Sequence, residues 1–150
     1  MSEAFDLVCL DADDTLWSNE IYFRAAEARL AELLAPWAEV ATVSARLLEV
    51  ERDNIGRYGF GAKAFVLSML ETALLVSDDA LPNRAVHELL DLGRAIIDQP
   101  VELLDDVAEV IEVLSAQWPL LLVTKGDLVH QEAKFLASGL VDHFRDVEIV

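Results

Sequence analysis

Two aspartates, Asp11 and Asp13, stand two positions apart where a short apolar run gives way to the polar segment DADDTLW. Side chains two positions apart around the end of a strand can point into one crevice. One carboxylate of such a pair can act as a nucleophile and the other as a general acid and base. Carboxylates are also ligands that Mg²⁺ prefers in proteins. Taken alone, such a pair more often only forms a turn that caps the end of a strand, so the pattern makes Asp11 and Asp13 candidate catalytic residues and candidate ligands of Mg²⁺.

A second polar cluster follows the apolar run at residues 119–123 and consists of Thr124, Lys125 and Gly126. A hydroxyl group and backbone N–H groups at the end of a strand can donate hydrogen bonds to an anion. In open parallel sheets, ligands bind beyond the carboxyl ends of the strands. We therefore predict Thr124 as an anion-binding residue, while Lys125 either contacts the same anion or faces solvent.

The elements that must position these residues can be read from the apolar pattern. The runs at residues 5–10, 119–123 and 147–150 have the length and composition of strands in a parallel sheet. Residues 103–117 and 128–138 show helical periodicity and would connect such strands. The sequence therefore predicts an α/β fold with a partial, Rossmann-like parallel sheet.

A long helical stretch, residues 19–98, separates the first strand from the others. It reads as four helices, with breaks near Pro36, at the glycine-rich segment GRYGFG and near Pro82. An insertion of about 80 residues is far longer than an ordinary loop, so we expect it to form its own all-helical subdomain. The α/β core would then consist of residues 1–18 and 99–150.

Composition limits the class of protein. The chain has 150 residues, of which 54% are hydrophobic, which is enough for a folded core. It has 28 acidic and 11 basic residues and a net charge of -17, which argues against nucleic acid and anionic membranes as partners. The single cysteine, Cys9, excludes a disulfide framework and is expected to be a small buried residue. No apolar run reaches membrane-spanning length and no signal peptide is recognisable, so we expect a cytoplasmic protein.

The two motifs also resemble those of a known family. The segment Leu10–Leu16 resembles the first motif of the haloacid dehalogenase (HAD) superfamily, an apolar strand followed by Asp-x-Asp-x-Thr. Leu121–Thr124 resembles the second motif, an apolar strand that ends in Thr or Ser. The helices between them resemble the helical cap of many HAD phosphatases. The resemblance implies an HAD-like core with an inserted cap and hydrolysis of a small phosphorylated metabolite, a phosphomonoester.

The resemblance also implies a role for each site residue. Asp11 would attack phosphorus and form an aspartyl-phosphate intermediate. Asp13 would act as general acid and base, and its backbone carbonyl would contact Mg²⁺. Thr124 and Lys125 would bind the phosphate. By the same resemblance, dehalogenases of the superfamily lack an aspartate at the position of Asp13, so its presence favours phosphoester chemistry, and a phosphomutase would use the same two aspartates.

In the family the cap supplies substrate-selecting residues, which makes Arg57, Tyr58 and Lys63 candidates for substrate contact or for an ordinary surface role. Two family motifs, a lysine and an acidic pair that completes the magnesium site, normally follow the third strand. Lys125 and Lys134 both precede that strand, so neither fits this lysine by position. We therefore expect a chain truncated after the third strand, with an exposed apolar edge at residues 5–10.

Two other interpretations stay open. A non-catalytic HAD-like fragment or module would keep the fold without the later lysine and acidic motifs. A phospho-accepting receiver domain also uses strand-end aspartates and magnesium. Its phosphorylated aspartate, however, lies on a later strand, and it has no large helical insertion after the first strand.

Overall fold

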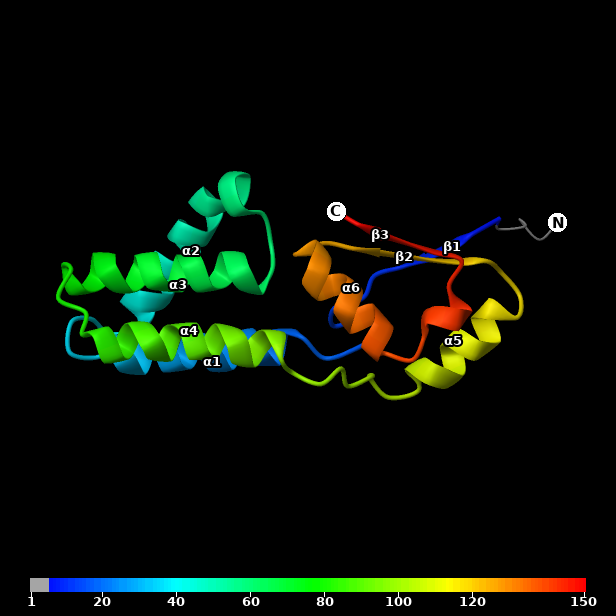
Figure 1. Cartoon of the computed structure of the whole chain (residues 1–150), viewed down its shortest axis with the longest axis horizontal. Coiled ribbons are helices and arrows are strands. Elements are labelled where there is room, and N and C mark those ends of the chain that lie inside the picture. The colour runs from blue at the N-terminus through cyan, green and yellow to red at the C-terminus, as the bar shows by residue number, and fades with distance from the viewer. Residues whose placement is uncertain (1–5) are drawn as a thin grey trace. The chain divides into compact units, whose positions relative to one another are not determined.

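The structure, a computed structural model, describes residues 6–150 and divides into two compact units (Figure 1). Of the described residues, 6–20 and 100–150 form one unit, called the α/β unit, and 21–99 form the other, called the helical unit. No helix in the described part of the chain has the length and apolar character needed to cross a membrane.

The α/β unit is built on a three-stranded parallel sheet. Its strands are β1 (Val8–Leu10), β2 (Leu120–Thr124) and β3 (Asp146–Ile149), in the spatial order β1-β2-β3. Leu10 lies opposite Leu122 in the register of the first pair. Because the strands are parallel, the carboxyl ends of β1 and β2 are neighbours, and the polar residues that follow both strands are brought to one edge of the sheet.

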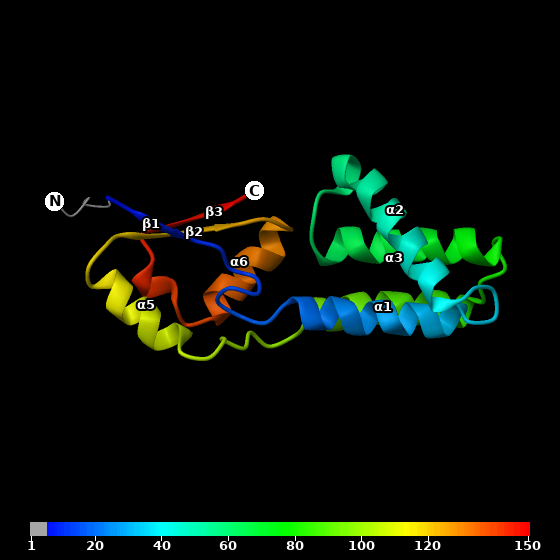
Figure 2. The ribbon, with the colours of Figure 1, turned by 180° about the vertical axis from the view of Figure 1, so that it is seen from behind.

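Helical segments connect the strands and cover one face of the sheet. They are α5 (Val107–Ser115), α6 (Leu128–Ala137) and the short 3-10 helix η1 (Val141–His143). Both α5 and α6 lie on the same side of the strands (Figures 1 and 2). The core of the unit is on this side, and its buried apolar residues are Ala12, Leu16, Trp17, Ile111, Leu120, Leu122, Phe135 and Leu140. The predicted α/β class with a partial parallel sheet is confirmed.

The opposite face of the sheet is less covered. Leu121 and Val123 are only half-buried on this face of β2, and Cys9 of β1 is exposed. The prediction that Cys9 is buried is therefore wrong, because the described helices of this unit pack on the other face. Among the described residues β1 pairs only with β2, so it lies at an edge of the sheet. Phe5, at the start of the expected edge 5–10, lies outside the described residues.

The helical unit contains the four helices expected from the sequence. They are α1 (Glu20–Leu34), α2 (Val40–Tyr58), α3 (Ala62–Ser77) and α4 (Asn83–Ile97). α3 packs against both α2 and α4 (Figure 1). The buried residues between the helices are Ala26, Leu30, Ala31, Leu34, Val43, Leu47, Ala62, Phe65, Met69, Ala73, Leu89 and Ile96.

Two glycines inside these helices have different surroundings. A Cβ atom at Gly93 of α4 would lie 2.1 Å from Cγ2 of Val66 in α3. The missing side chain therefore allows the close approach of the two helices. A Cβ atom at Gly56 of α2 would have no neighbour within 4 Å. The glycine-rich break comes after this residue, because α2 continues to Tyr58 and ends at Gly59, whose φ of 70° favours glycine.

The helix before β2 begins later than the sequence pattern predicts, at Val107. The preceding segment instead pairs with the chain that leaves the first motif. Ser18 N–H donates to Glu102 O, and Leu104 N–H donates to Leu16 O, both at 3.0 Å. These tertiary hydrogen bonds give the Glu102 carbonyl and the Leu104 N–H partners outside any helix.

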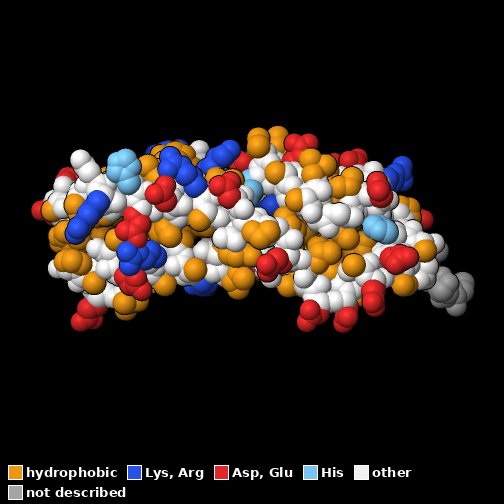
Figure 3. Space-filling view, turned by 60° about the horizontal axis from the view of Figure 1, so that its bottom comes forward, with side chains coloured by type: hydrophobic (Ala, Val, Ile, Leu, Met, Phe, Trp, Pro, Cys, Tyr) orange, Lys and Arg blue, Asp and Glu red, His pale blue; other side chains and the backbone are white. Residues whose placement is uncertain are grey.

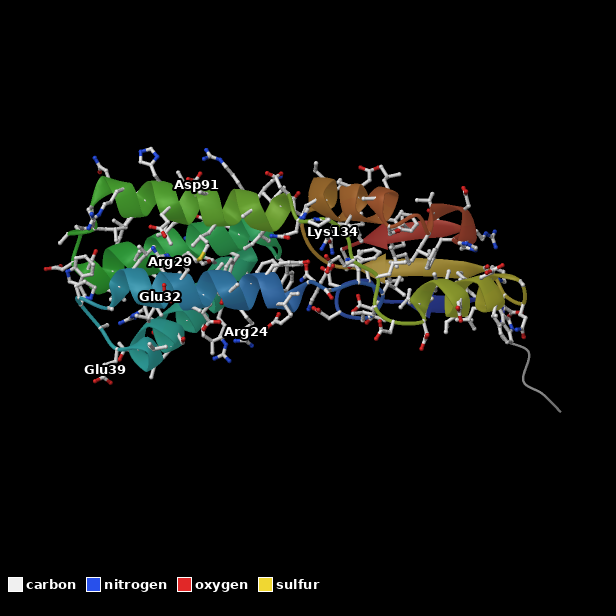
Figure 4. The ribbon with its side chains drawn as sticks, turned by 90° about the horizontal axis from the view of Figure 1, so that it is seen from below. Arg24, Arg29, Glu32, Glu39, Asp91 and Lys134 are labelled. Carbon is white, nitrogen blue, oxygen red and sulfur yellow. The ribbon has the colours of Figure 1, made fainter. Side chains whose placement is uncertain are left out.

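Charged side chains pair on the surface of the helical unit. Arg29 of α1 bonds Glu32 on the same helix and Glu88 on α4 (Figure 4). The hydrogen bond to Glu88, with a further one to Glu32, raises the pKa of the Arg29 guanidinium above its ordinary value. Acidic side chains are spread over the face seen in Figure 3 and do not form one continuous patch. Most acidic side chains of the described residues are exposed, so the net charge of -17 lies mainly at solvated surface.

Candidate active site at the strand ends

The chain turns sharply after β1. Thr15 N–H and Leu16 N–H both donate to the carbonyl of Ala12, at 3.1 and 2.7 Å. Ala12 and Leu16 are buried, so the turn is anchored in the core, while Asp11 is exposed at its start. Within residues 6–150 the carboxylate of Asp11 makes no side-chain hydrogen bond. The nucleophile predicted from the sequence is thus held by backbone geometry and faces outward.

Asp14, the next acidic residue in the turn, has a structural role. It adopts a left-handed conformation, with a φ of 58°. Its carboxylate accepts hydrogen bonds from Asn19 N–H and Glu20 N–H at 2.9 to 3.1 Å. These N–H groups belong to the start of α1 and have no partner inside the helix, so Asp14 satisfies them.

Asp13 occupies the centre of a hydrogen-bond network. Its Oδ1 accepts from the indole Nε1 of Trp17 at 2.8 Å and from Nζ of Lys134 at 2.6 Å. Its Oδ2 accepts from Nε2 of Gln131 at 2.9 Å. Both oxygens of this carboxylate are therefore held, in contrast to the exposed carboxylate of Asp11.

Gln131 joins this network to the end of β2. Its Nε2 also lies 2.9 Å from Oγ1 of Thr124 and 3.0 Å from the carbonyl oxygen of Lys125. An amide has two hydrogens, so three acceptors share two donors. The other amide atom, Oε1, is buried and has no hydrogen-bond partner among residues 6–150. The assignment of nitrogen and oxygen is supported because Asp13 and the Lys125 carbonyl can only accept hydrogen bonds.

The start of α6 sets the position of Gln131. The side chain of Asp127 caps the helix by accepting a hydrogen bond from His130 N–H at 3.0 Å. Gly126 has a φ of 144°, and a Cβ atom there would lie 3.2 Å from Cγ of Gln131. The loop therefore wraps closely around the glutamine. Lys134 follows three positions after Gln131, and such residues lie on one face of a helix.

The structure brings together some of the predicted site residues. Asp13 and Thr124 are linked through Gln131, and Thr124 is 4% exposed. The side chain of Lys125 is exposed, and its carbonyl enters this network. Asp11 lies next to the network in the chain without a side-chain bond to it.

The three predicted cap residues lie in the helical unit. Arg57 and Tyr58 form the last turn of α2, Lys63 lies in the first turn of α3, and all three are exposed. Near them the helical unit contains a cavity of about 350 Å³. Phe23, Leu48 and Phe60 contribute to its apolar lining, and the polar residues Asn54 and Ser68 also line it. The role of Arg57, Tyr58 and Lys63 in substrate contact stays a prediction.

Sequence reasoning missed Gln131 and Lys134. The two residues lie 118 and 121 positions from Asp13, so no local pattern connects them with it. The available signal was an amide and an ammonium group spaced three residues apart in the helix that follows Thr124. Such polar residues on one helix face usually indicate nothing more than a solvated surface.

The fold and the site together define a class of protein. The class has a Rossmann-like sheet, an acidic loop after the first strand, a threonine at the end of the neighbouring strand and a helical insertion between the two. The model of the haloacid dehalogenase-like hydrolases matches residues 5–150. The chain belongs to this hydrolase family, as the two motifs predict.

Solved structures show the same fold. A haloacid dehalogenase-like family hydrolase from Xanthomonas campestris is 40% identical, with a TM-score of 0.92 over 99% of this chain and 63% of that chain. The magnesium-bound HAD-hydrolase YfnB from Bacillus subtilis is 20% identical, with a TM-score of 0.58 over 98% of this chain and 64% of that chain. L-2-haloacid dehalogenase from Xanthobacter autotrophicus, with chloropropionic acid covalently bound, is 19% identical, with a TM-score of 0.60 over 98% of this chain and 57% of that chain.

The last two relatives share the fold at low identity. The chain spans less than two thirds of the length of each of the three proteins. No curated protein sequence matches the chain.

Proposed function

We propose that the chain carries the nucleophile and the acid/base of a magnesium-dependent phosphomonoester hydrolase. The observation that carries the proposal is the network around Asp13. This network holds the Asp13 carboxylate beside Thr124 at the end of β2. Asp13 follows Asp11, whose carboxylate is exposed, by two positions in the chain. A leaving alkoxide needs a proton donor, and Asp13 is in a position to supply one. A halide leaving group needs none, so this arrangement favours phosphoester chemistry over dehalogenation.

The proposed reaction has two steps. In the first, an oxygen of Asp11 bonds to phosphorus, the bond from phosphorus to the leaving oxygen breaks, and Asp13 gives that oxygen its proton. In the second, water attacks the same phosphorus, Asp13 takes a proton from the water, and inorganic phosphate leaves with the Asp11 carboxylate restored. Each step transfers one proton through the carboxyl group of Asp13.

Thr124 is suited to bind the phosphate oxygens. Its Oγ1 accepts a hydrogen bond from Gln131, which leaves its own hydrogen available to donate. Preorganised donors of this kind stabilise charge that develops in a transition state. The side chain of Lys125 is a second candidate, since it is exposed at the same loop.

The donor set suits a magnesium ion. The carboxylate of Asp11 and the backbone carbonyl of Asp13 are hard oxygen ligands, and Mg²⁺ is commonly bound by one or two carboxylates together with water and phosphate. The part of the chain that the structure describes contains no group of three or more His, Cys, Asp or Glu residues able to hold a metal. The bound ion would screen the repulsion between Asp11 and the substrate phosphate.

The test is hydrolysis of 4-nitrophenyl phosphate with and without MgCl₂, for the unmodified protein and for Asp11→Asn. We expect turnover that requires magnesium and falls by more than about 1,000-fold in the variant, because the nucleophile is lost. Asp142→Asn is the matched control, since Asp142 is an exposed aspartate on η1 in the same unit. Full turnover by Asp11→Asn, or no turnover by the folded unmodified protein, would contradict the proposal.

A further inference from the structure

We propose that Lys134 and Gln131 of α6 form a clamp that positions the Asp13 carboxylate, which makes Lys134 a positioning residue of the reaction. This inference rests on the function proposed above. The two residues, called the α6 clamp, hold one carboxylate oxygen each: Nζ of Lys134 lies 2.6 Å from Oδ1, and Nε2 of Gln131 lies 2.9 Å from Oδ2. Lys134 projects from α6 in Figure 4.

The burial of the ion pair distinguishes it from a surface contact. The side chains of Lys134 and Asp13 are 11% and 23% exposed. In the pair of Arg24 with Glu27 on α1, by comparison, the arginine is 69% exposed. Removing a lysine and a carboxylate from water is costly, and an apolar residue would serve packing at that position at least as well. A part-buried ion pair at this place is therefore better explained by a role in orienting the Asp13 carboxylate than by a contribution to stability.

The contacts fix the plane of the carboxylate. Trp17 and Lys134 both donate to Oδ1, and Gln131 donates to Oδ2. Nζ of Lys134 also lies 3.1 Å from Oδ1 of Asn19, which restricts the ammonium group as well. With both oxygens held from different directions, the carboxyl group cannot rotate freely about its last torsion angle.

The clamp also ties Asp13 to the place where the phosphate is expected. The amide of Gln131 that holds Asp13 lies 2.9 Å from Oγ1 of Thr124. The acid/base and the phosphate-binding hydroxyl therefore share one anchor on α6. Such preorganisation matters because a misplacement of about 1 Å in an active site can reduce a rate by about 100-fold.

The leaving-group dependence of hydrolysis tests the clamp. Phenyl phosphate has a poor leaving group that depends on the proton from Asp13, whereas 2,4-dinitrophenyl phosphate has a good one that does not. We expect Lys134→Met to lower kcat/KM for phenyl phosphate by about 100-fold and for dinitrophenyl phosphate by less than about 10-fold, because kcat/KM reports the first step, in which only phenyl phosphate needs the proton from Asp13. Lys134→Arg should recover part of the lost kcat/KM.

Arg145→Met is the matched control. It removes an exposed cation from the same unit and should leave both rates unchanged. If Lys134→Met does not fold, Lys134→Leu also removes the hydrogen-bond donor to Oδ1 of Asp13 and carries the same comparison. Equal losses on both substrates, or no loss, would overturn the clamp while the proposed function stands. Absence of magnesium-dependent turnover in the unmodified protein would instead overturn the proposed function, and with it the clamp's role.

Discussion

At the scale of single residues, the site depends on one amide group. Nε2 of Gln131 serves Asp13, Thr124 and the carbonyl of Lys125, and the side chain is buried at 3% exposure. Its contribution to stability can be separated from any contribution to catalysis, because methionine has a similar length and volume but cannot donate a hydrogen bond. The same glutamine can therefore be tested by unfolding alone.

We predict that Gln131→Met lowers the free energy of unfolding by about 1–2 kcal/mol, because buried acceptors lose their donor. The loss is moderated because the unpartnered Oε1 disappears as well. Urea unfolding followed by circular dichroism measures the change. Gln117→Met is the control: Gln117 is exposed, so its replacement should change stability by less than about 0.5 kcal/mol. Equal effects of the two substitutions would contradict the role given to Gln131.

The positions of the candidate site residues could be predicted only where the neighbouring sequence indicates a strand end. Asp11, Asp13 and Thr124 stand next to apolar runs, so their place at strand ends follows from the sequence. Gln131 and Lys134 reach Asp13 only after α6 has packed beneath the sheet. The amphipathic pattern of α6 does not indicate which of its polar residues will pack against a carboxylate.

At the scale of elements, two helical glycines provide a matched pair. We predict that Gly56→Ala raises the free energy of unfolding by about 0.5–1 kcal/mol, because alanine loses less backbone entropy in a helix and its Cβ meets open space. Gly93→Ala should lower it by about 1–3 kcal/mol, because the new methyl group would overlap Val66. Thermal and urea unfolding of both variants give the comparison. Stabilisation by both changes would show that α3 and α4 do not approach as closely as described.

Most elements could be predicted from apolar periodicity, including the four helices of the insertion and the order of strands and helices around it. Two expectations at this scale were wrong for tertiary reasons. The helix at Val107 begins late because the preceding backbone pairs with Leu16 and Ser18. Cys9 is exposed because an apolar strand does not reveal which of its faces a helix will cover.

At the scale of the whole molecule, the net negative charge is the feature that most affects stability. The net charge is -17, and self-repulsion of this size opposes the compact state. Surface pairs such as Arg29 with Glu88 contribute little, because both side chains are solvated. Repulsion among the negative charges therefore destabilises the folded protein more than the surface ion pairs stabilise it.

We predict that the melting temperature rises when NaCl is increased from about 0.01 M to 0.5 M, because the screening length falls from about 30 Å to a few ångströms. Differential scanning calorimetry at constant pH provides the measurement. The matched comparison is Arg29→Gln, which removes one positive charge and should make the dependence on salt slightly steeper. A melting temperature that falls with added salt would mean that attractive pairs outweigh the net charge.

The hydrogen bond from Trp17 to Asp13 has an optical consequence. The indole of Trp17 is 1% exposed and donates directly to the proposed acid/base, whereas Trp37 is 39% exposed and lies in the helical unit. A buried indole emits at shorter wavelength than a solvated one, and its quantum yield responds to the charge beside its nitrogen. A charged ligand that binds beside the Asp13 carboxylate therefore changes the blue part of the emission spectrum, and Trp17 can report occupancy of the proposed site.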